Sequence, residues 1–365
     1  MEARFLDRMA RAAAGTERAG LTGLLVTPGA DLRYLSGYDP PPLPRLTCLV
    51  LRPGHHALLL VPALERARAE ESPVGRSVEL VTWNDGDDPY AKLGGLVGPA
   101  GSYGAADRTW AVHLLALQRE LSGASFVPAS GVLAPIRAVK DEDELERLGR
   151  VARTTDEGFR RIVRAPLEGR REEEVAHELA EILEDLGHDA VTFTIVASGP
   201  NGASPHHEPG GRTIRAGDPV VLDFGGRIAG YCSDLSRTVS VGGTPREFEE
   251  VYEIVREAQE AAFQVARPGV AAEDVDRAAR EVIERAGHGE RFIHRTGHGI
   301  GLDEHEEPYI VSGNREPLRP GMCFSIEPGI YLEGRFGVRI EDIVAVTDDG
   351  AVRLNHATRD LELVG

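Results

Sequence analysis

The sequence predicts an α+β protein of two domains, a small α/β domain followed by a larger domain with pseudo-two-fold symmetry. Three observations support this prediction. The length of 365 residues suits about two hydrophobic cores. Short apolar runs alternate with helical patterns between residues 20 and 130. Beyond them, one helical segment recurs with a displacement of one hundred residues.

The first domain, residues 1–133, begins with an amphipathic charged helix within residues 1–20. Four apolar runs then predict strands, namely GLLVTP, TCLVLRP, HHALLLVP and SVELVTW. Two further segments, PYAKLGGLVG and TWAVHLLALQREL, predict helices that cover the strands. The region has no clustered His or Cys and no paired carboxylates at ligand spacing, so we assign it no chemistry.

The second domain, residues 134–365, leads into a long charged amphipathic helix, KDEDELERLGRVARTTDEGFRRIV. Residues 173–188 (EEVAHELAEILEDLGH) resemble residues 273–288 (EDVDRAAREVIERAGH). Helices rich in Ala, Glu and Arg can resemble one another through composition alone. The alternative is a duplicated helix–helix–strand unit, and a ligand site would then lie where the sheets of the two halves meet.

Composition excludes several classes of protein. With 59 acidic and 41 basic side chains the net charge is -18, which argues against partners such as nucleic acid or an anionic membrane. No apolar stretch approaches the roughly 18 residues of a membrane span. The three cysteines, Cys48, Cys232 and Cys323, are widely spaced and form no CxxC pair. This pattern fits a reducing compartment, and we expect a cytoplasmic protein.

Two aspartates flank a glycine-rich connection in PVVLDFGGRIAGYCSDLSRTVSV. If Gly225 to Gly230 form the connection of a hairpin, Asp223 and Asp234 face each other on antiparallel strands. Either aspartate alone is most simply a turn cap. Two facing carboxylates repel unless a proton or a cation lies between them, so the pair indicates a cation site.

Histidines and glycines interleave in FIHRTGHGIGLDEHEEPYI, which holds His294, His298 and His305. A single histidine is more often structural than a ligand. Glycines at this density permit close backbone approach, as a substrate pocket requires. The cluster therefore predicts a functional site.

Two glutamates occur in apolar strand patterns, one at the end of a pattern and the other inside one. Glu327 ends the apolar run of GMCFSIEPGIY, and Glu341 lies in the middle of FGVRIEDIVAV. Arg339 shares a strand face with Glu341, so a simple surface ion pair would explain these two residues. It would not explain Glu327. Burying a carboxylate among Val and Ile requires a partner.

These candidates together match a dinuclear metal centre. Asp223, Asp234, Glu327 and Glu341 supply four negative charges, and His298 supplies a neutral nitrogen. Two divalent cations would balance this set. We expect Mn²⁺, with Co²⁺, Zn²⁺ or Fe²⁺ as alternatives, because similar ions suit oxygen and imidazole ligands. Two such ions activate water and polarise a carbonyl, as amide hydrolysis requires.

At this point the sequence resembles a known family. LDFGG, GYCSDLSRT, HRTGHGIGLDEHE, SIEPGIY and GVRIED occur in order. They resemble the pita-bread metallopeptidases that cleave Xaa-Pro bonds, Xaa-Pro dipeptidase (prolidase) and aminopeptidase P. The resemblance covers the whole chain and is most specific between residues 190 and 345. It implies a creatinase-like N-terminal domain and a pita-bread catalytic domain with pseudo-two-fold symmetry.

The resemblance also implies roles for the metal ligands. Asp223 would bind one metal, Asp234 and Glu341 would bridge both, and His298 and Glu327 would complete the second.

Further roles concern the substrate. Glu327 matches the family's proton acceptor, and His206, in SGPNGASPHHEPG, matches a histidine that contacts the substrate. His305 matches the residue that stabilises the tetrahedral intermediate, and His294 lies near the residue after the scissile bond. Arg339 would bind the substrate in the pocket and hold the carboxylate of a metal ligand.

The implied activity is dinuclear metal-dependent hydrolysis of the bond between an N-terminal residue and proline in short proline-containing peptides. The implied assembly is a homodimer. A dipeptidase is favoured because the chain is compact. The alternatives are an aminopeptidase P acting on longer peptides, an amidohydrolase of a small N-acyl metabolite, and a non-enzymatic pita-bread binding protein. Intact ligand positions weigh against the last.

Overall fold

The computed structural model describes residues 2–365. Its contacts divide the chain into two units, one ending at Arg137 and one running from Ala138 to Gly365. The expected boundary at residue 133 lies inside helix α6 (Ser130–Ala138). Among the described residues, no helix combines the length and the apolar character needed to cross a lipid bilayer.

The first unit is built on a six-stranded mixed sheet with the order β4-β3-β2-β1-β5-β6. β1 pairs antiparallel with β2 and parallel with β5. The strands are β1 (Gly23–Val26), β2 (Cys48–Leu51), β3 (Leu58–Pro62), β4 (Glu79–Trp83), β5 (Ala100–Ala105) and β6 (Gly123–Pro128). The helices are α1 (Glu2–Arg18), α2 (Ala30–Ser36), η1 (Ala63–Glu65), α3 (Arg66–Glu70), α4 (Pro89–Val97) and α5 (Ala111–Glu120). Leu93 of α4 and Leu117 of α5 share a buried cluster with Leu25 of β1, so these helices cover one face of the sheet.

The four strands and three helices expected in this region are confirmed. Two further strands, β5 and β6, were not expected, because AGSYGA and GASFVP lack the apolar run that marks the other strands. They form because β5 pairs with the buried β1 and β6 pairs with β5.

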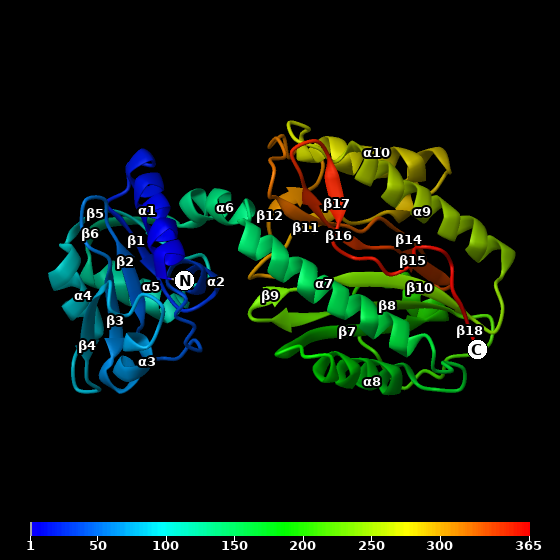
Figure 1. The fold of residues 1–365 in the computed structure, drawn as a ribbon, viewed down its shortest axis with the longest axis horizontal. Coiled ribbons are helices and arrows are strands. Elements are labelled where there is room, and N and C mark those ends of the chain that lie inside the picture. Colours follow the sequence, from blue (N-terminus) through cyan, green and yellow to red (C-terminus); the bar gives the residue numbers. More distant parts are fainter. Residues whose placement is uncertain (1) are drawn as a thin grey trace. The chain divides into compact units, whose positions relative to one another are not determined.

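The second unit contains two similar halves. The first half has α7 (Glu142–Ile162) and α8 (Glu172–Asp185), followed by a sheet with the order β18-β10-β8-β7. The second half has α9 (Arg246–Val265) and α10 (Ala272–Arg285), followed by a sheet with the order β12-β11-β13-β16-β17. In Figure 1, α8 lies on one side of the two sheets and α9 with α10 on the other. Because α8 and α10 begin and end one hundred residues apart, the repeat in the sequence corresponds to a repeat in the structure.

The remaining elements of the second unit are the strands of these two sheets, a separate antiparallel ribbon formed by β14 and β15, and short helical turns. They are β7 (Ala190–Ser198), η2 (Gly199–Ala203), β8 (Pro219–Ile228), β9 (Tyr231–Cys232), β10 (Leu235–Val241), η3 (Gly289–Arg291), β11 (Gly297–Gly299), β12 (Glu306–Ile310), β13 (Cys323–Ile326), β14 (Gly329–Leu332), β15 (Phe336–Arg339), β16 (Asp342–Val346), β17 (Ala351–Arg353) and β18 (Leu363–Val364).

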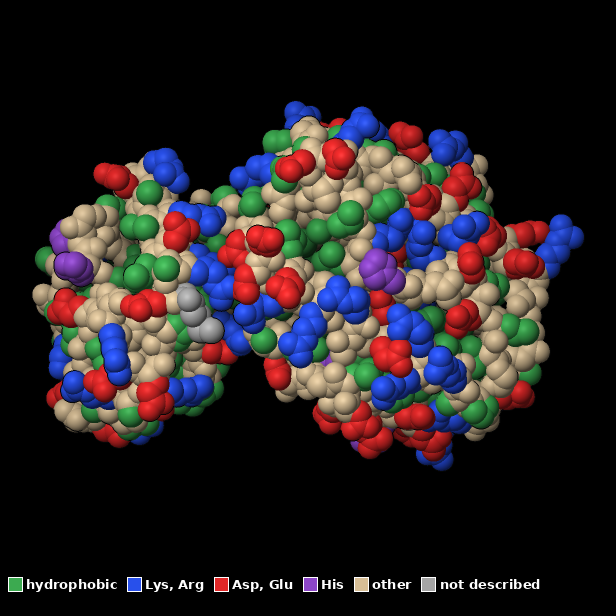
Figure 2. Space-filling view, in the orientation of Figure 1, with side chains coloured by type: hydrophobic (Ala, Val, Ile, Leu, Met, Phe, Trp, Pro, Cys, Tyr) green, Lys and Arg blue, Asp and Glu red, His purple; other side chains and the backbone are tan. Residues whose placement is uncertain are grey.

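Each half packs its helices against its own sheet. Phe159 of α7, Leu179 of α8 and Leu222 of β8 belong to one buried cluster. Phe248 of α9 and Phe324 of β13 belong to another. The polar faces of these amphipathic helices are left for solvent. On the face drawn in Figure 2, acidic and basic side chains are interspersed, in keeping with mostly solvated carboxylates.

The expected hairpin around Asp223 and Asp234 exists, but its connection is shorter than Gly225 to Gly230. β8 continues to Ile228, and the turn is formed by Ala229 and Gly230, both with positive φ. Gly225 is instead inside the strand, where a Cβ would lie 2.1 Å from the carbonyl oxygen of Ser233. The glycine therefore permits close approach of the partner strand. Asp223 pairs in register with Ser236, so it does not stand directly opposite Asp234.

Candidate metal centre

The five predicted metal ligands converge between the two sheets of the second unit. Three of them, Asp223, Asp234 and Glu341, bring one oxygen each within 4.8 Å of one another. His298, Glu327 and Glu341 form a second group by the same measure. Glu341 is common to both groups, as a ligand bridging two ions would be.

The two halves of the unit contribute different ligands. Asp223 lies on β8 and Asp234 between β9 and β10. His298 lies on β11, Glu327 directly follows β13, and Glu341 lies between β15 and β16. The expectation that Glu341 stands inside a strand is therefore wrong. The chain leaves the β14–β15 ribbon at Arg339 and joins the second sheet at Asp342, so Glu341 sits at the crossing.

The carboxylates are crowded and poorly satisfied by the protein. Asp223 Oδ1 and Glu341 Oε1 are buried and have no hydrogen-bond partner among residues 2–365. Burial, reinforced by the neighbouring carboxylates, raises the pKa of Asp234 and of Glu341 well above the usual range. Burial also raises the pKa of Glu327 to about 7. A cation would supply the missing partner for these oxygens.

His298 is oriented to offer a lone pair. Its Nδ1 lies 3.1 Å from the carbonyl oxygen of Gly299, which can only accept, so Nδ1 carries the proton. Nε2 then points its lone pair at the carboxylates, 3.3 Å from Glu327 Oε1 and 3.6 Å from Asp234 Oδ2. Burial lowers the pKa of His298 to about 3, and the neutral ring is the form that binds metal.

Arg339 anchors a chain of contacts on one side of the centre. Its guanidinium donates to Asp223 Oδ2, to Ser236 Oγ at 2.8 Å and to the Tyr331 hydroxyl at 2.9 Å. The Tyr331 hydroxyl lies 2.8 Å from His294 Nε2, and His294 Nδ1 lies 2.7 Å from the carbonyl oxygen of Arg295. Arg339 is 3% exposed, which excludes the surface ion pair weighed from the sequence. Both nitrogens of His294 are thus engaged within the protein.

His206 is carried into the site by a segment that a buried glutamate holds. Glu172, at the start of α8, accepts hydrogen bonds from Ser198 N and Oγ at 2.7 Å and from Asn201 Nδ2 at 3.0 Å. His207 Nε2 lies 2.9 Å from the same carboxylate. His207 is therefore the anchor of the segment, while the neighbouring His206 is exposed and lines the pocket.

The five candidate ligands line a pocket with a volume of about 580 Å³. His294, His305 and Arg339 line it, as expected of substrate-contacting residues. The rings of His305 and His298 lie 4.0 Å apart. The substrate roles of the histidines stay predictions. Lining residues that the sequence did not single out for the pocket are Phe193, Ile195, Pro205, Arg295 and Glu304.

For some of these pocket-lining residues, the sequence contains a pattern that could have indicated their position. Phe193 and Ile195 lie two apart on β7 and so share a face, which the alternation of VTFTIV could have revealed. Glu304 pairs with Arg227 at 3.2 Å, a contact across 77 residues that no local pattern announces.

The donor set fits divalent metal ions. Four carboxylates and one neutral imidazole form two overlapping groups, and two buried oxygens are left without partners. Such oxygen-rich sites with one imidazole suit divalent first-row ions.

Two family models match this chain. The model of metallopeptidase family M24 matches residues 146–348, and the creatinase/prolidase N-terminal domain matches residues 8–139. The chain belongs to metallopeptidase family M24. It is therefore a peptidase of the pita-bread fold with a creatinase-like N-terminal domain, as the sequence motifs led us to expect, and it binds divalent metal.

Relatives within the family match over nearly the whole chain. A probable dipeptidase, PepE, of Mycobacterium bovis is 46% identical over 363 residues, covering 99% of this chain and 96% of that protein. An Xaa-Pro dipeptidase of Lactobacillus helveticus is 36% identical over 345 residues, covering 91% and 92%. The crystal structure of a recombinant prolidase from Thermococcus sibiricus superposes with a TM-score of 0.93 at 41% identity, covering 99% of each chain.

Proposed function

We propose that this metallopeptidase is an Xaa-Pro dipeptidase that works with two divalent ions. The observation that carries the proposal is the pair of overlapping ligand groups that share Glu341 below a pocket of about 580 Å³. The names of the Lactobacillus helveticus and Thermococcus sibiricus relatives support the substrate class. When bound, the ions supply a Lewis acid for the scissile carbonyl and lower the pKa of water.

The chain's own groups would handle protons and charge. Glu327, which lines the pocket and accepts a hydrogen bond from Ser325 Oγ at 3.1 Å, accepts a proton from the attacking water. His305 donates a hydrogen bond to the oxygen on which negative charge develops, because partial desolvation of its ring lowers its pKa and keeps the ring neutral with one N–H. His206 contacts the substrate from the segment that Glu172 holds.

Arg295 favours a dipeptidase over an aminopeptidase that acts on longer peptides. It lines the pocket with its guanidinium 4.5 Å from the centre of the Tyr309 ring, and no hydrogen bond or ion pair from that guanidinium is present within residues 2–365. The other pocket arginine, Arg339, is committed to Asp223, Ser236 and Tyr331. Arg295 is thus available for the free carboxylate that a dipeptide presents directly after the scissile bond.

Substrate length and an arginine variant test this assignment together. With Mn²⁺ present, Ala-Pro should be cleaved and Ala-Pro-Ala should be a poor substrate. Arg295→Leu should lower kcat/KM for Ala-Pro by roughly 10- to 100-fold, the value of one charge-assisted hydrogen bond, and should change that for Ala-Pro-amide little. Cleavage of the tripeptide alone would establish an aminopeptidase. No hydrolysis, with fewer than one ion per chain, would favour a binding protein.

The number and identity of the ions belong to the same proposal. Metal analysis of protein loaded with Mn²⁺ should give two ions per chain. Mn²⁺ is proposed because oxygen ligands dominate the site, while Co²⁺, Zn²⁺ and Fe²⁺ fit the same donor set.

A homodimer is supported by an apolar surface on the first unit. Trp110, Val112 and Leu115 stand at the start of α5 with 42%, 59% and 63% of their surfaces exposed. A second copy is the occupant we propose. Leu115→Glu should convert a dimer into a monomer in light scattering, and a wild-type protein that is already monomeric would contradict the assignment.

The free, buried Cys48, Cys232 and Cys323 support a cytoplasmic location.

A further inference from the structure

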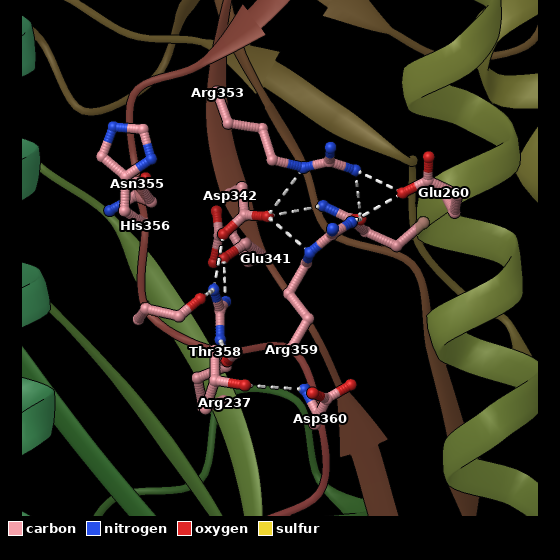
Figure 3. A network of polar contacts seen from close by, with 12 residues as sticks. Arg237, Glu260, Glu341, Asp342, Arg353, Asn355, His356, Thr358, Arg359 and Asp360 are labelled. Carbon is pink, nitrogen blue, oxygen red and sulfur yellow. Dashed lines mark hydrogen bonds and ion pairs between the residues drawn. The ribbon is translucent and has the colours of Figure 1, made fainter.

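A buried polar network lies directly behind the metal ligand Glu341. At its centre Asp342, which is 1% exposed, meets Arg237, Arg353 and Arg359. In Figure 3, Arg353 and Arg359 lie between Asp342 and helix α9, and Arg237 approaches Asp342 from the other side. Neither Arg237 nor Asp342 lines the pocket, so neither has a place in the chemistry described above.

Arg237 uses its whole guanidinium in this network. Nε donates to Thr358 O at 2.6 Å, and one terminal nitrogen donates to Ser236 O at 2.9 Å and to Glu341 O. The other donates to Asp342 Oδ1 at 2.6 Å and to Ala357 O at 2.9 Å. Five N–H groups thus make five hydrogen bonds, in a fork geometry that lysine cannot reproduce.

The network joins the two sheets at the point where the ligands meet. Arg237 lies on β10 of the first sheet and Asp342 begins β16 of the second. Beside them, Glu341 N donates to Ser236 O at 3.0 Å, and Ser236 pairs in register with Asp223. A short path of backbone therefore connects the ligand Asp223 of one sheet with the ligand Glu341 of the other.

The far side of Asp342 is held just as firmly. Its Oδ2 accepts a hydrogen bond from Gln259 Nε2 of α9 at 3.0 Å and lies 3.3 Å from Arg353 Nε. Arg353 and Arg359 both donate to Glu260 at 2.7 Å. Helix α9 and the C-terminal segment thus brace the strand that starts after Glu341 (Figure 3).

We propose that Arg237 and Asp342 form a metal-independent clamp between the two sheets, which holds Glu341 at the separation from Asp223 and Asp234 that metal binding requires. They are positioning residues, which act through Glu341. A site that is already assembled binds its ions without first ordering the ligands, so the clamp raises metal affinity.

Hydrogen exchange of the wild-type protein gives the first test. The clamp predicts that the amide of Glu341 and those of β16 are strongly protected in the EDTA-treated protein, with little further protection when Mn²⁺ is added. Rapid exchange in the metal-free protein, with protection only after Mn²⁺ binds, would overturn the proposal. This measurement requires no variant.

Variants give the second test, by calorimetric titration of metal-free protein with Mn²⁺. Arg237→Lys and Asp342→Asn should raise the dissociation constant of at least one ion tenfold or more. At saturating Mn²⁺ both should recover most of kcat, with KM within about twofold of wild type, because neither touches substrate.

Asp156→Asn is the matched control. Asp156 is fully buried and accepts hydrogen bonds from Asn355 and His356 of the same C-terminal segment, but within residues 2–365 no hydrogen bond or ion pair joins it to Asp342. This variant should lower the melting temperature while leaving Mn²⁺ affinity within twofold of wild type. Equal loss of affinity in the control, or wild-type affinity in both clamp variants, would contradict the clamp.

The clamp rests on the proposed two-ion centre, and the two fail differently. A wild-type protein that binds no Mn²⁺ would remove the centre together with the clamp. Unaltered Mn²⁺ affinity in the clamp variants, with Ala-Pro still hydrolysed, would remove the clamp alone.

Discussion

Replacing Glu172 by glutamine tests how the segment that carries His206 is held. The buried carboxylate serves Ser198, Asn201 and His207, all with donors between 2.7 and 3.0 Å away. Glutamine keeps the shape, but its NH₂ group cannot accept, so it loses about two of these charge-assisted bonds. At roughly 1.5–3 kcal/mol each, the loss of two bonds is about 3–6 kcal/mol in the free energy of unfolding. For a unit of this size, each kcal/mol lowers the melting temperature by about 2–4 °C, so the expected fall is roughly 6–24 °C.

The same variant should also affect catalysis. We expect kcat/KM for Ala-Pro to fall roughly tenfold as His206 becomes less well positioned, an effect of about 1.4 kcal/mol. Mn²⁺ affinity should not change, since none of the five ligands lies on this segment. Glu173→Gln is the control, because the Glu173 side chain is half-exposed and, among residues 2–365, pairs only with Arg171 at 3.3 Å. A lowered melting temperature with wild-type kcat/KM would refute the link between Glu172 and His206, and unchanged stability would refute the energetic reasoning.

Three further predictions concern the metal centre. Glu327→Gln should reduce turnover of Ala-Pro by at least ~10³ with an unchanged circular dichroism spectrum, and near-normal turnover would exclude Glu327 as base and ligand. Burial raises the pKa of Glu327 from 4.5 in the unfolded chain to about 7 in the metal-free folded protein. The protonated carboxyl therefore contributes its full stability below pH 4.5, and this contribution is lost as the pH rises through 7. The melting temperature of EDTA-treated protein should therefore fall between pH 5 and pH 8, and the increase produced by Mn²⁺ should grow; a flat profile would contradict the shift. Arg339→Gln, which frees Asp223 and Tyr331, should weaken Mn²⁺ binding roughly tenfold in calorimetry, and equal affinity would show that Arg339 does not orient the ligand.

The convergence of the five candidate ligands was predictable from the sequence because each of them interrupts a local pattern. Glu327 ends an apolar strand, and His298 stands among glycines in a tight run. A charged residue where the pattern demands an apolar one has to be explained by a partner, and the partners proved to be the other candidates. Strands β5 and β6 had no such signal, since small residues become strands only through their neighbours.

The residues that hold the ligands in place could not be predicted in this way. Arg237 and Asp342 are 105 residues apart, and Glu172 and His207 are 35 apart. Arginine, aspartate and glutamate are common in this chain and give no local sign of burial. The register at Asp223 was equally hidden, because Gly225 reads as a turn residue until the approach of Ser233 is seen.

Because the predicted ligands are divided between the two halves, we expect neither half to be an enzyme by itself. One supplies Asp223 and Asp234, and the other supplies His298, Glu327 and Glu341. The halves are joined through exposed Thr244 and Pro245, and the C-terminal strand β18 returns to pair with β10 of the first half. A chain cut between them would yield two inert fragments, the second of which carries the strand that completes the first. Hydrolysis of Ala-Pro would then be regained only when the two fragments reassemble, so the protein could serve as a split-enzyme reporter.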